Sequence, residues 1–308
     1  MIRVPEAFAR STVAREGEPG SRWIAELPLI VDGLLDRWSC SPDGEVTHGG
    51  VGIIVPVRAP AGPAVLKVSF PHPGNVHEPD AFAAWGGRGA VLLHERADER
   101  FAMLLERARP STPAEIGDDD EIIRIAGRLS RRLAVPAPAH LPRLRDRAPA
   151  WADQLRKDAE QLPHTMPDRV IGAAIASAED LAHGQPDTLV HGDLHPGNIL
   201  RADREPWLAV DPKGYAGDPA YDVGALLKSR ALSLLRADDH ARAFNRALDV
   251  FAESAELDRD RVHRWAQLHA VQAAFHARRH GFHVARTGPD LEAIAALADH
   301  LASLLTTP

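Results

Sequence analysis

The pattern of apolar and polar residues predicts strands in the first third of the chain. Short runs rich in valine, isoleucine and leucine, bounded by glycine and proline, are typical of strands. Such runs occupy residues 46–57, 64–68, 90–94 and 101–106. Pro60 and Pro63 mark a turn between the first two runs. The pattern therefore predicts a small, mostly antiparallel sheet.

Helical periodicity dominates the remainder. Between Trp23 and Trp38 apolar residues recur at helical spacing, and Pro28 interrupts them, so short helical pieces are expected there. A further helix should begin at Glu78 and end at Trp85. Beyond the sheet we expect a helix around residues 122–129, a loop over 136–149, helices over 151–162 and 170–182, strands at 188–190 and 207–210, and helices from 223 onward with breaks near 258 and at 288–289.

Composition narrows the classes of function. The chain has 308 residues, of which 44% are hydrophobic, as in ordinary globular proteins. With 36 basic and 43 acidic residues the net charge is −7, which argues against a nucleic-acid binder and suits a cationic small molecule. Cys40 is the single cysteine, so an intrachain disulfide is excluded. The sequence has neither a signal-like apolar stretch nor a membrane-spanning run, so we expect a cytoplasmic protein without a membrane partner; its oligomeric state stays open.

The segment His191-Gly-Asp-Leu-His-Pro-Gly-Asn-Ile-Leu200 carries the candidate chemistry. It places Asp193 and Asn198 five residues apart in a loop made tight by glycine and proline, and Asp211 follows at the end of a strand. Phosphoryl transfer needs an acidic group that orients the attacking hydroxyl, and oxygen ligands that hold magnesium. Asp193 fits the first role, and Asn198 and Asp211 fit the second.

This loop resembles the His-Gly-Asp-x-His-x-x-Asn hallmark of the aminoglycoside phosphotransferase and choline kinase family. The element Gly217-Asp218-Pro-Ala-Tyr-Asp222 matches the family as well. The resemblance implies an α+β, protein-kinase-like fold with a small β-rich lobe over residues 1–107 and a larger helical lobe over residues 108–308. It also implies an enzyme that uses ATP and Mg²⁺ to phosphorylate a hydroxyl group of a small molecule.

The resemblance assigns nucleotide-binding roles in the first lobe. Lys67 lies within an expected strand and is one of only four lysines; it resembles the family lysine that holds the α- and β-phosphates. Its carboxylate partner is Glu78, with Asp80 as a competitor. Gly50 and Gly52 could let backbone amides approach phosphates, although the cluster lacks the third glycine of the kinase loop and also fits a plain hairpin turn. Glu106 lies where adenine should find backbone partners, or simply ends a strand.

Roles for the residues around the loop also follow from the resemblance. His191 is expected to brace the turn, and Asp222 to hold the loop through its backbone amides. Asp218 either faces a cationic substrate or caps the helix that begins near Pro219. Lys213 either neutralises the transferring phosphoryl group or pairs with a nearby carboxylate.

The run Asp211-Pro-Lys-Gly214 is the form found in the streptomycin 6-kinase and hydroxyurea phosphotransferase group. This resemblance covers most of residues 45–230 and implies a cationic aminoglycoside, streptomycin first, as the substrate. Hydroxyurea, an amino sugar or another small metabolite are the alternatives within the enzyme class. A nucleotide-binding pseudokinase that regulates a partner is the alternative from another class.

Overall fold

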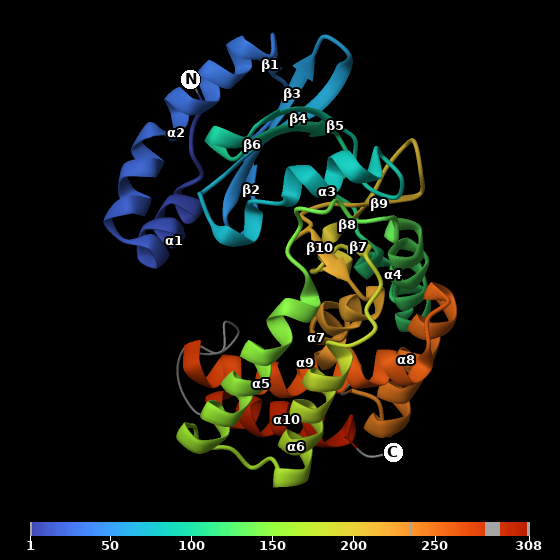
Figure 1. Cartoon of the computed structure of the whole chain (residues 1–308). Coiled ribbons are helices and arrows are strands. Elements are labelled where there is room, and N and C mark those ends of the chain that lie inside the picture. Colours follow the sequence, from blue (N-terminus) through green and yellow to red (C-terminus); the bar gives the residue numbers. More distant parts are fainter. Residues whose placement is uncertain (1, 235, 281–289, 307–308) are drawn as a thin grey trace. The chain divides into compact units, whose positions relative to one another are not determined.

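The computed structural model describes residues 2–234, 236–280 and 290–306. The chain forms two compact units, the first made of residues 1–110 and 200–213 and the second of residues 111–199 and 214–308 (Figure 1). The boundary expected after residue 107 assigns residues 200–213 to the second lobe, whereas in the structure they belong to the first unit. They do so because Ala209 exchanges backbone hydrogen bonds with Gly89 and Val91. The break expected at residues 288–289 lies outside the described residues.

An antiparallel sheet forms the centre of the first unit. Its strand order is β1-β3-β4-β6-β5, and β2 pairs with β3. Residues Pro60 and Ala61 connect β3 to β4, as expected, with Ala59 opposite Gly62. The strands are β1 (Ser41–Pro42), β2 (Thr47–His48), β3 (Gly52–Ala59), β4 (Gly62–Ser69), β5 (Leu93–Ala97) and β6 (Ala102–Glu106).

The expected strand at residues 90–94 is wrong in its position, because β5 begins only at Leu93. Ala90 instead forms an isolated bridge with Ala209 in β9 (Trp207–Ala209). The strand β9 pairs in turn with β8 (Ile199–Arg201). Backbone groups before β5 therefore find some of their hydrogen-bond partners outside the main sheet, as Val91 N does at the carbonyl of Ala209.

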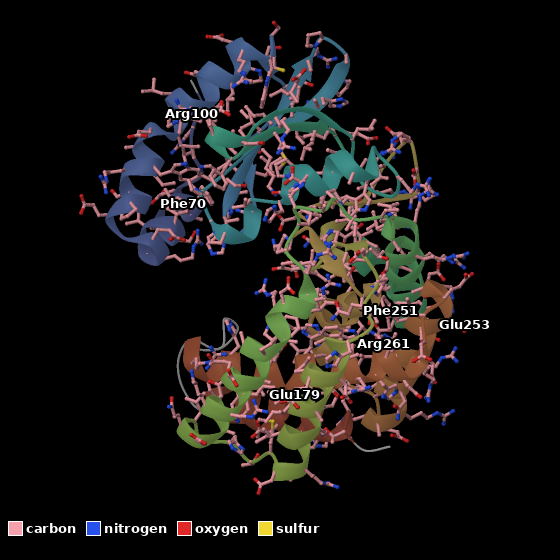
Figure 2. The ribbon with its side chains drawn as sticks, viewed as in Figure 1. Phe70, Arg100, Glu179, Phe251, Glu253 and Arg261 are labelled. Carbon is pink, nitrogen blue, oxygen red and sulfur yellow. The ribbon has the colours of Figure 1, made fainter. Side chains whose placement is uncertain are left out.

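Side chains alternate between the two faces of the sheet. On one face Val55 and its partner Leu66 are fully buried in a core with Trp23 and Leu27. That core is covered by helices α1 (Glu6–Glu16) and α2 (Glu18–Arg37) (Figure 1). Phe70, labelled in Figure 2, lies edge-on to Trp23, with 5.5 Å between the ring centres. Lys67 follows Leu66, so its side chain lies on the other face of the sheet.

Helix α2 is continuous, contrary to the short pieces expected around Pro28. Proline removes one hydrogen bond from a helix interior and is usually disruptive there. In α2 a stripe of apolar residues is buried on one side, and this burial offsets the loss. The stripe comprises Trp23, Leu27, Val31, Leu34 and Leu35.

The second unit is mainly helical. Its core is assembled by α4 against α8, α5 against α6, and α9 against α6, α7 and α10; Phe251 on α8 and Arg261 on α9 are marked in Figure 2. Strands β7 (Thr188–Val190) and β10 (Tyr215–Gly217) pair antiparallel. The helices are α4 (Asp119–Leu133), α5 (Leu144–Gln161), α6 (Asp168–Leu181), α7 (Val223–Leu234), α8 (His240–Ala255), α9 (Arg259–His280) and α10 (Asp290–Leu304).

The loop expected over residues 136–149 is also wrong in its second half. Helix α5 begins at Leu144 and passes through Pro149. Ala148, Ala152 and Leu155 are buried on one side of this helix, so packing again outweighs the hydrogen bond that proline removes.

Within the described residues, no helix combines the length and apolar character needed to cross a membrane.

Candidate active site

Lys67 lies on β4 within a cluster of charges in the first unit. Its Nζ donates to Glu78 Oε1 at 2.5 Å and to Asp211 Oδ1 at 2.6 Å. Glu78 is on α3 (Glu78–Trp85), and both it and Lys67 are buried. A buried ammonium of this kind is stable only when paired, and here two carboxylates surround it.

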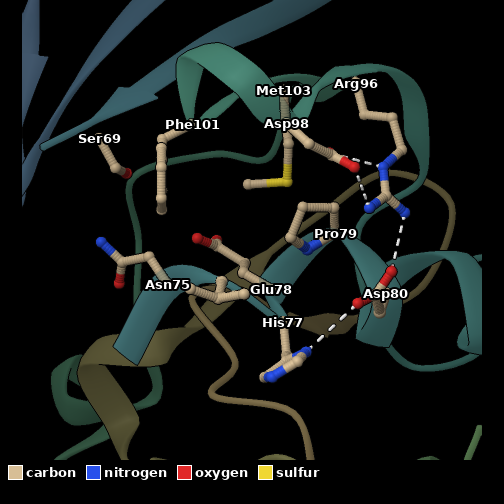
Figure 3. A pocket seen from close by; sticks show the side chains of 11 residues that line it. Ser69, Asn75, His77, Glu78, Pro79, Asp80, Arg96, Asp98, Phe101 and Met103 are labelled. Carbon is tan, nitrogen blue, oxygen red and sulfur yellow. Dashed lines mark hydrogen bonds and ion pairs between the residues drawn. The ribbon is translucent and has the colours of Figure 1, made fainter. Parts of the chain in front are cut away.

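Asp80, the competing partner, binds elsewhere. It accepts from Arg96 Nη1 at 3.0 Å and lies 3.4 Å from His77 Nδ1. Figure 3 shows these contacts on one side of Pro79 and Glu78 on the other, in a cavity of about 210 Å³. The carboxylate that pairs with Lys67 is thus Glu78, the first residue of α3.

Two lysines keep Asp211 ionised. Its Oδ2 accepts from Lys213 Nζ at 3.2 Å, while Oδ1 accepts from Lys67. Burial by itself would raise the pKa of Asp211, but the two ammonium groups lower it to about 2. The carboxylates of Glu78 and Asp211 in turn hold the pKa of Lys67 above its ordinary value, although burial lowers it. Lys67 and Asp211 therefore carry fixed charges at neutral pH, whereas burial raises the pKa of Glu78 to about 7 against the opposing effect of Lys67.

The glycine cluster forms the turn between β2 and β3. Gly49 N donates to the carbonyl of Gly52 at 2.9 Å, and the carbonyl of Gly50 accepts from Arg15. A Cβ on Gly52 would lie 2.7 Å from Ser69 Oγ, whereas one on Gly50 would lie in open space. Close packing against Ser69 on β4 thus explains why residue 52 is a glycine. Contact of Gly50 and Gly52 with phosphates stays a prediction.

Glu106 ends β6, and its side chain is engaged within the first unit. Its carboxylate accepts from Leu92 N at 3.0 Å and from Arg204 Nη2 at 2.8 Å. Its own backbone N–H donates to the carbonyl of Leu92. These bonds join β6 to the segment before β5, and the expected adenine contact stays a prediction.

The loop that contains Asp193 is braced by short-range hydrogen bonds in the second unit. His191 is fully buried, and its Nδ1 accepts from Asp193 N at 3.2 Å. Asn198 Nδ2 donates to the carbonyl of Asp193 at 3.0 Å. Gly192 has φ +84°, a conformation that favours glycine. The backbone of Asp193 is therefore held on both sides by neighbours in the motif.

Asp222, which lies 30 residues after Gly192 in the sequence, fixes the same loop. Its Oδ1 accepts from Gly192 N at 2.7 Å, and backbone amides of His191 and Leu194 also donate to it. Burial raises the pKa of Asp222 to about 7, and these amides oppose that rise. The contacts agree with the bracing role that the resemblance implies.

Asp218 is buried, and both of its carboxylate oxygens accept hydrogen bonds from residues of the second unit. Its Oδ1 accepts from Ala220 N and so caps the 3-10 helix Pro219–Asp222. Its Oδ2 accepts from Arg261 Nε and Trp265 Nε1, each at 2.8 Å. Of the two alternatives, the hydrogen bonds support the cap.

A pocket of about 500 Å³ in the second unit is lined by Asp193. Its walls include Trp151 and Tyr221, whose rings stack at 6.0 Å, and two charged residues from different helices, Asp158 on α5 and Arg279 on α9. Neither Asp158 nor Arg279 was predicted from the sequence. They belong to helices far from the motif in sequence, and the residue pattern alone carries no signal that places them in the same pocket as Asp193.

His269 forms another part of this wall, where α9 meets α7. A Cβ on Gly224 would lie 2.3 Å from the His269 ring, so only glycine fits beneath it. Burial lowers the pKa of His269 to about 4, although a hydrogen bond to the backbone of Tyr221 opposes the shift. The imidazole is therefore neutral at physiological pH.

Solved structures with the same fold define the class. A choline/ethanolamine kinase family protein from Mesorhizobium loti has a TM-score of 0.59 at 17% identity and covers 91% of this chain and 96% of its own. The aminoglycoside phosphotransferase APH(4)-Ia has a TM-score of 0.56 at 14% identity and covers 91% and 98%. The fold, with a β-sheet unit and a helical unit, is therefore the kinase-like fold of these small-molecule phosphotransferases.

Sequence relatives define the family more narrowly. Residues 37–281 match the aminoglycoside/hydroxyurea antibiotic resistance kinase family. The streptomycin 6-kinases of Streptomyces griseus and Streptomyces glaucescens are 38% and 35% identical over 88% and 89% of this chain, and 89% and 90% of theirs. The hydroxyurea phosphotransferase of Kitasatospora aureofaciens is 31% identical over 88% of this chain and 79% of its own. The chain belongs to this family and is a phosphotransferase with a hydroxyl acceptor.

Proposed function

We propose that the protein transfers the γ-phosphoryl group of ATP to the 6-hydroxyl of streptomycin in a Mg²⁺-dependent reaction. The observation that carries the proposal is that Asp193, held by the bracing loop, lines a pocket large enough for a drug-sized acceptor. Membership of the family and the identity to the two streptomycin 6-kinases support it.

In this proposal Lys67 binds the α- and β-phosphates of ATP. Its raised pKa keeps it cationic, and Glu78 fixes the direction of its side chain. Lys213, which lies against Asp211, supplies further positive charge for the transferring phosphoryl group. Because the transition state spreads charge over the phosphoryl oxygens, such fixed cations lower the barrier.

Asp211 and Asn198 are the residues that would hold magnesium. Mg²⁺ prefers oxygen ligands, and the lowered pKa of Asp211 keeps its carboxylate ionised. Asn198 uses its Nδ2 on the carbonyl of Asp193, which leaves the amide oxygen as its ligand atom. Bound magnesium would neutralise charge on the phosphates.

Asp193 orients the acceptor hydroxyl for in-line attack. The hydroxyl oxygen forms a bond to the γ-phosphorus, the bond from that phosphorus to the β,γ-bridging oxygen breaks, and ADP leaves. The hydroxyl proton passes to the Asp193 carboxylate. Since the backbone of Asp193 is bonded on both sides, the carboxylate is positioned before the substrate binds, which reduces the cost of orientation.

Hydroxyurea is the second candidate acceptor, because a hydroxyurea phosphotransferase is among the relatives. A molecule with so few atoms would fill little of a pocket of about 500 Å³. The size of the pocket and the higher identity to the streptomycin 6-kinases therefore favour streptomycin.

Product mass after incubation with ATP and Mg²⁺ tests the proposal. Streptomycin should gain about 80 mass units with matching release of ADP, and fragmentation or NMR should place the phosphate on the 6-hydroxyl. Hydroxyurea, offered at the same concentration, should react much more slowly. Modification of hydroxyurea alone would transfer the proposal to that substrate, and modification of neither would contradict it.

A further inference from the structure

Asp158 has a buried carboxylate oxygen without a described partner at the wall of the acceptor pocket. The residue is 3% exposed, and its Oδ2 has no hydrogen-bond partner among the described residues. It lines the same pocket as Asp193. A buried charge that is not fully paired is costly, so a residue that retains one calls for an explanation through a ligand.

The other oxygen of Asp158 is firmly held. Gln154 Nε2 donates to Oδ1 at 2.8 Å, and Arg279 Nε lies 3.2 Å from the same atom. These contacts from α5 and α9 fix the orientation of the carboxylate. They also demonstrate that a guanidinium group can reach it.

Arg279 differs from Asp158 in exposure. Its side chain is 32% exposed, against 4% for that of Asp158. A partly exposed arginine can move outward and stay hydrated. The short, buried side chain of Asp158 cannot move with it. Of the two partners in this ion pair, Arg279 is therefore the one that another cation could displace.

Aromatic rings add a second feature that favours cations. Trp151 and Tyr221 stack in the pocket wall, and the Arg147 guanidinium lies 5.9 Å from the centre of the Trp151 ring and 5.0 Å from that of Tyr215. Faces of aromatic rings attract guanidinium and ammonium groups. The pocket thus combines a buried carboxylate with aromatic surface, and an organic cation that binds there would compete with Arg147, Lys228 and Arg279, which also line it.

We propose that Asp158 is the specificity-determining residue that binds a guanidinium or ammonium group of the acceptor, in competition with Arg279. This inference rests on the proposed function, because it assigns a substrate group to the pocket of Asp193. It identifies the acceptor as a hydroxyl compound with an organic cation. Asp158 acts through binding and takes no part in phosphoryl transfer.

The test compares two variants with opposite expectations, by calorimetric titration of the whole protein with streptomycin. Asp158→Asn should weaken binding about tenfold or more, since it removes a charge-assisted hydrogen bond. Arg279→Met should strengthen binding roughly twofold or more, because it removes the competing cation. Both variants break the same ion pair, so a merely structural role would weaken binding in both.

Matched controls separate these effects from general changes in charge. Asp153→Asn removes an exposed carboxylate from α5, and Arg264→Met removes an exposed guanidinium from α9; neither should change streptomycin binding. ATP binding should be unchanged in all four variants, which also reports that each one folds. Turnover of hydroxyurea, which has no cationic group, should not respond to Asp158→Asn.

Three results would overturn the inference: unchanged binding by Asp158→Asn, equal weakening by both variants, or no binding of streptomycin to the wild-type protein. The proposed function fails in a different way. If streptomycin binds with the expected dependence on Asp158 and Arg279 but gains no phosphate, the cation site stands and the phosphorylation of streptomycin does not.

Discussion

Lys67 and Asp211 are 144 residues apart in sequence, yet the lysine Nζ lies 2.6 Å from the aspartate Oδ1. The contact joins β4 to the segment after β9 within the first unit. It brings together one residue assigned to the phosphates and one assigned to the metal. The charge state of each depends on the other, because each shifts the pKa of its partner.

Replacement of Lys67 by methionine should impair use of ATP. It would remove the proposed hydrogen bonds to phosphate, and it leaves the buried Glu78 without its cation. We expect kcat/KM for ATP to fall about 10- to 100-fold or more, and the unfolding free energy to fall by about 3–5 kcal/mol. Steady-state kinetics and urea unfolding measure the two effects. Lys157→Met, at an exposed position on α5, is the control and should change neither.

Asp193→Asn should reduce turnover while nucleotide binding persists. The amide keeps the size of the side chain but cannot accept the hydroxyl proton, so kcat should fall by about 10²–10⁴. The dissociation constant of ATP, measured by calorimetry, should stay within about twofold, because the proposed role of this residue is on the acceptor. Near-normal turnover in the variant would remove Asp193 from its proposed role.

Asp218→Ala should destabilise the second unit without a selective effect on substrate. The change leaves Arg261 and the buried indole of Trp265 without their acceptor. We expect the unfolding free energy to drop by about 3–5 kcal/mol, against less than about 1 kcal/mol for Asp249→Ala, which breaks an exposed pair with Arg259. A stable variant with a greatly raised KM for streptomycin would revive the substrate-facing alternative.

Gly224→Ala and Gly172→Ala should have opposite effects on stability. Alanine at 224 would meet the His269 ring at 2.3 Å, so the ring must shift, at a cost of about 1–3 kcal/mol. Gly172 lies on α6 with nothing within 4 Å, and alanine there should stabilise by about 1 kcal/mol through helix propensity. Thermal unfolding measures both changes, and equal shifts in one direction would contradict the packing argument.

Acid should destabilise the protein through His269. Its pKa is about 4 in the folded state, against about 6.5 for an ordinary histidine, so the unfolded chain binds more protons between these values. As pH falls from 6.5 to 4, this group removes up to about 3 kcal/mol of stability. The unfolding free energy of wild type relative to His269→Asn should therefore decline over that range. Parallel curves for the two proteins would contradict the assignment.

Local sequence determined the loop around Asp193. Gly192, with its positive φ, and the bonds from His191 and Asn198 to Asp193 all lie within eight residues. Such a motif can be recognised from the sequence because its geometry depends on neighbours along the chain. The strands β3 and β4 and helix α3 were predictable for the same reason, since their periodicity and their terminating residues are local.

Tertiary packing decided the rest. Helices α2 and α5 continue through Pro28 and Pro149 because buried apolar stripes offset a local penalty. The choice of Glu78 over Asp80 depends on which face of α3 meets β4. The position of Asp158 in the same pocket as Asp193 depends on how α5 and α9 pack. These outcomes are sums of contacts between residues distant in sequence, and the residue pattern of any one segment does not contain them.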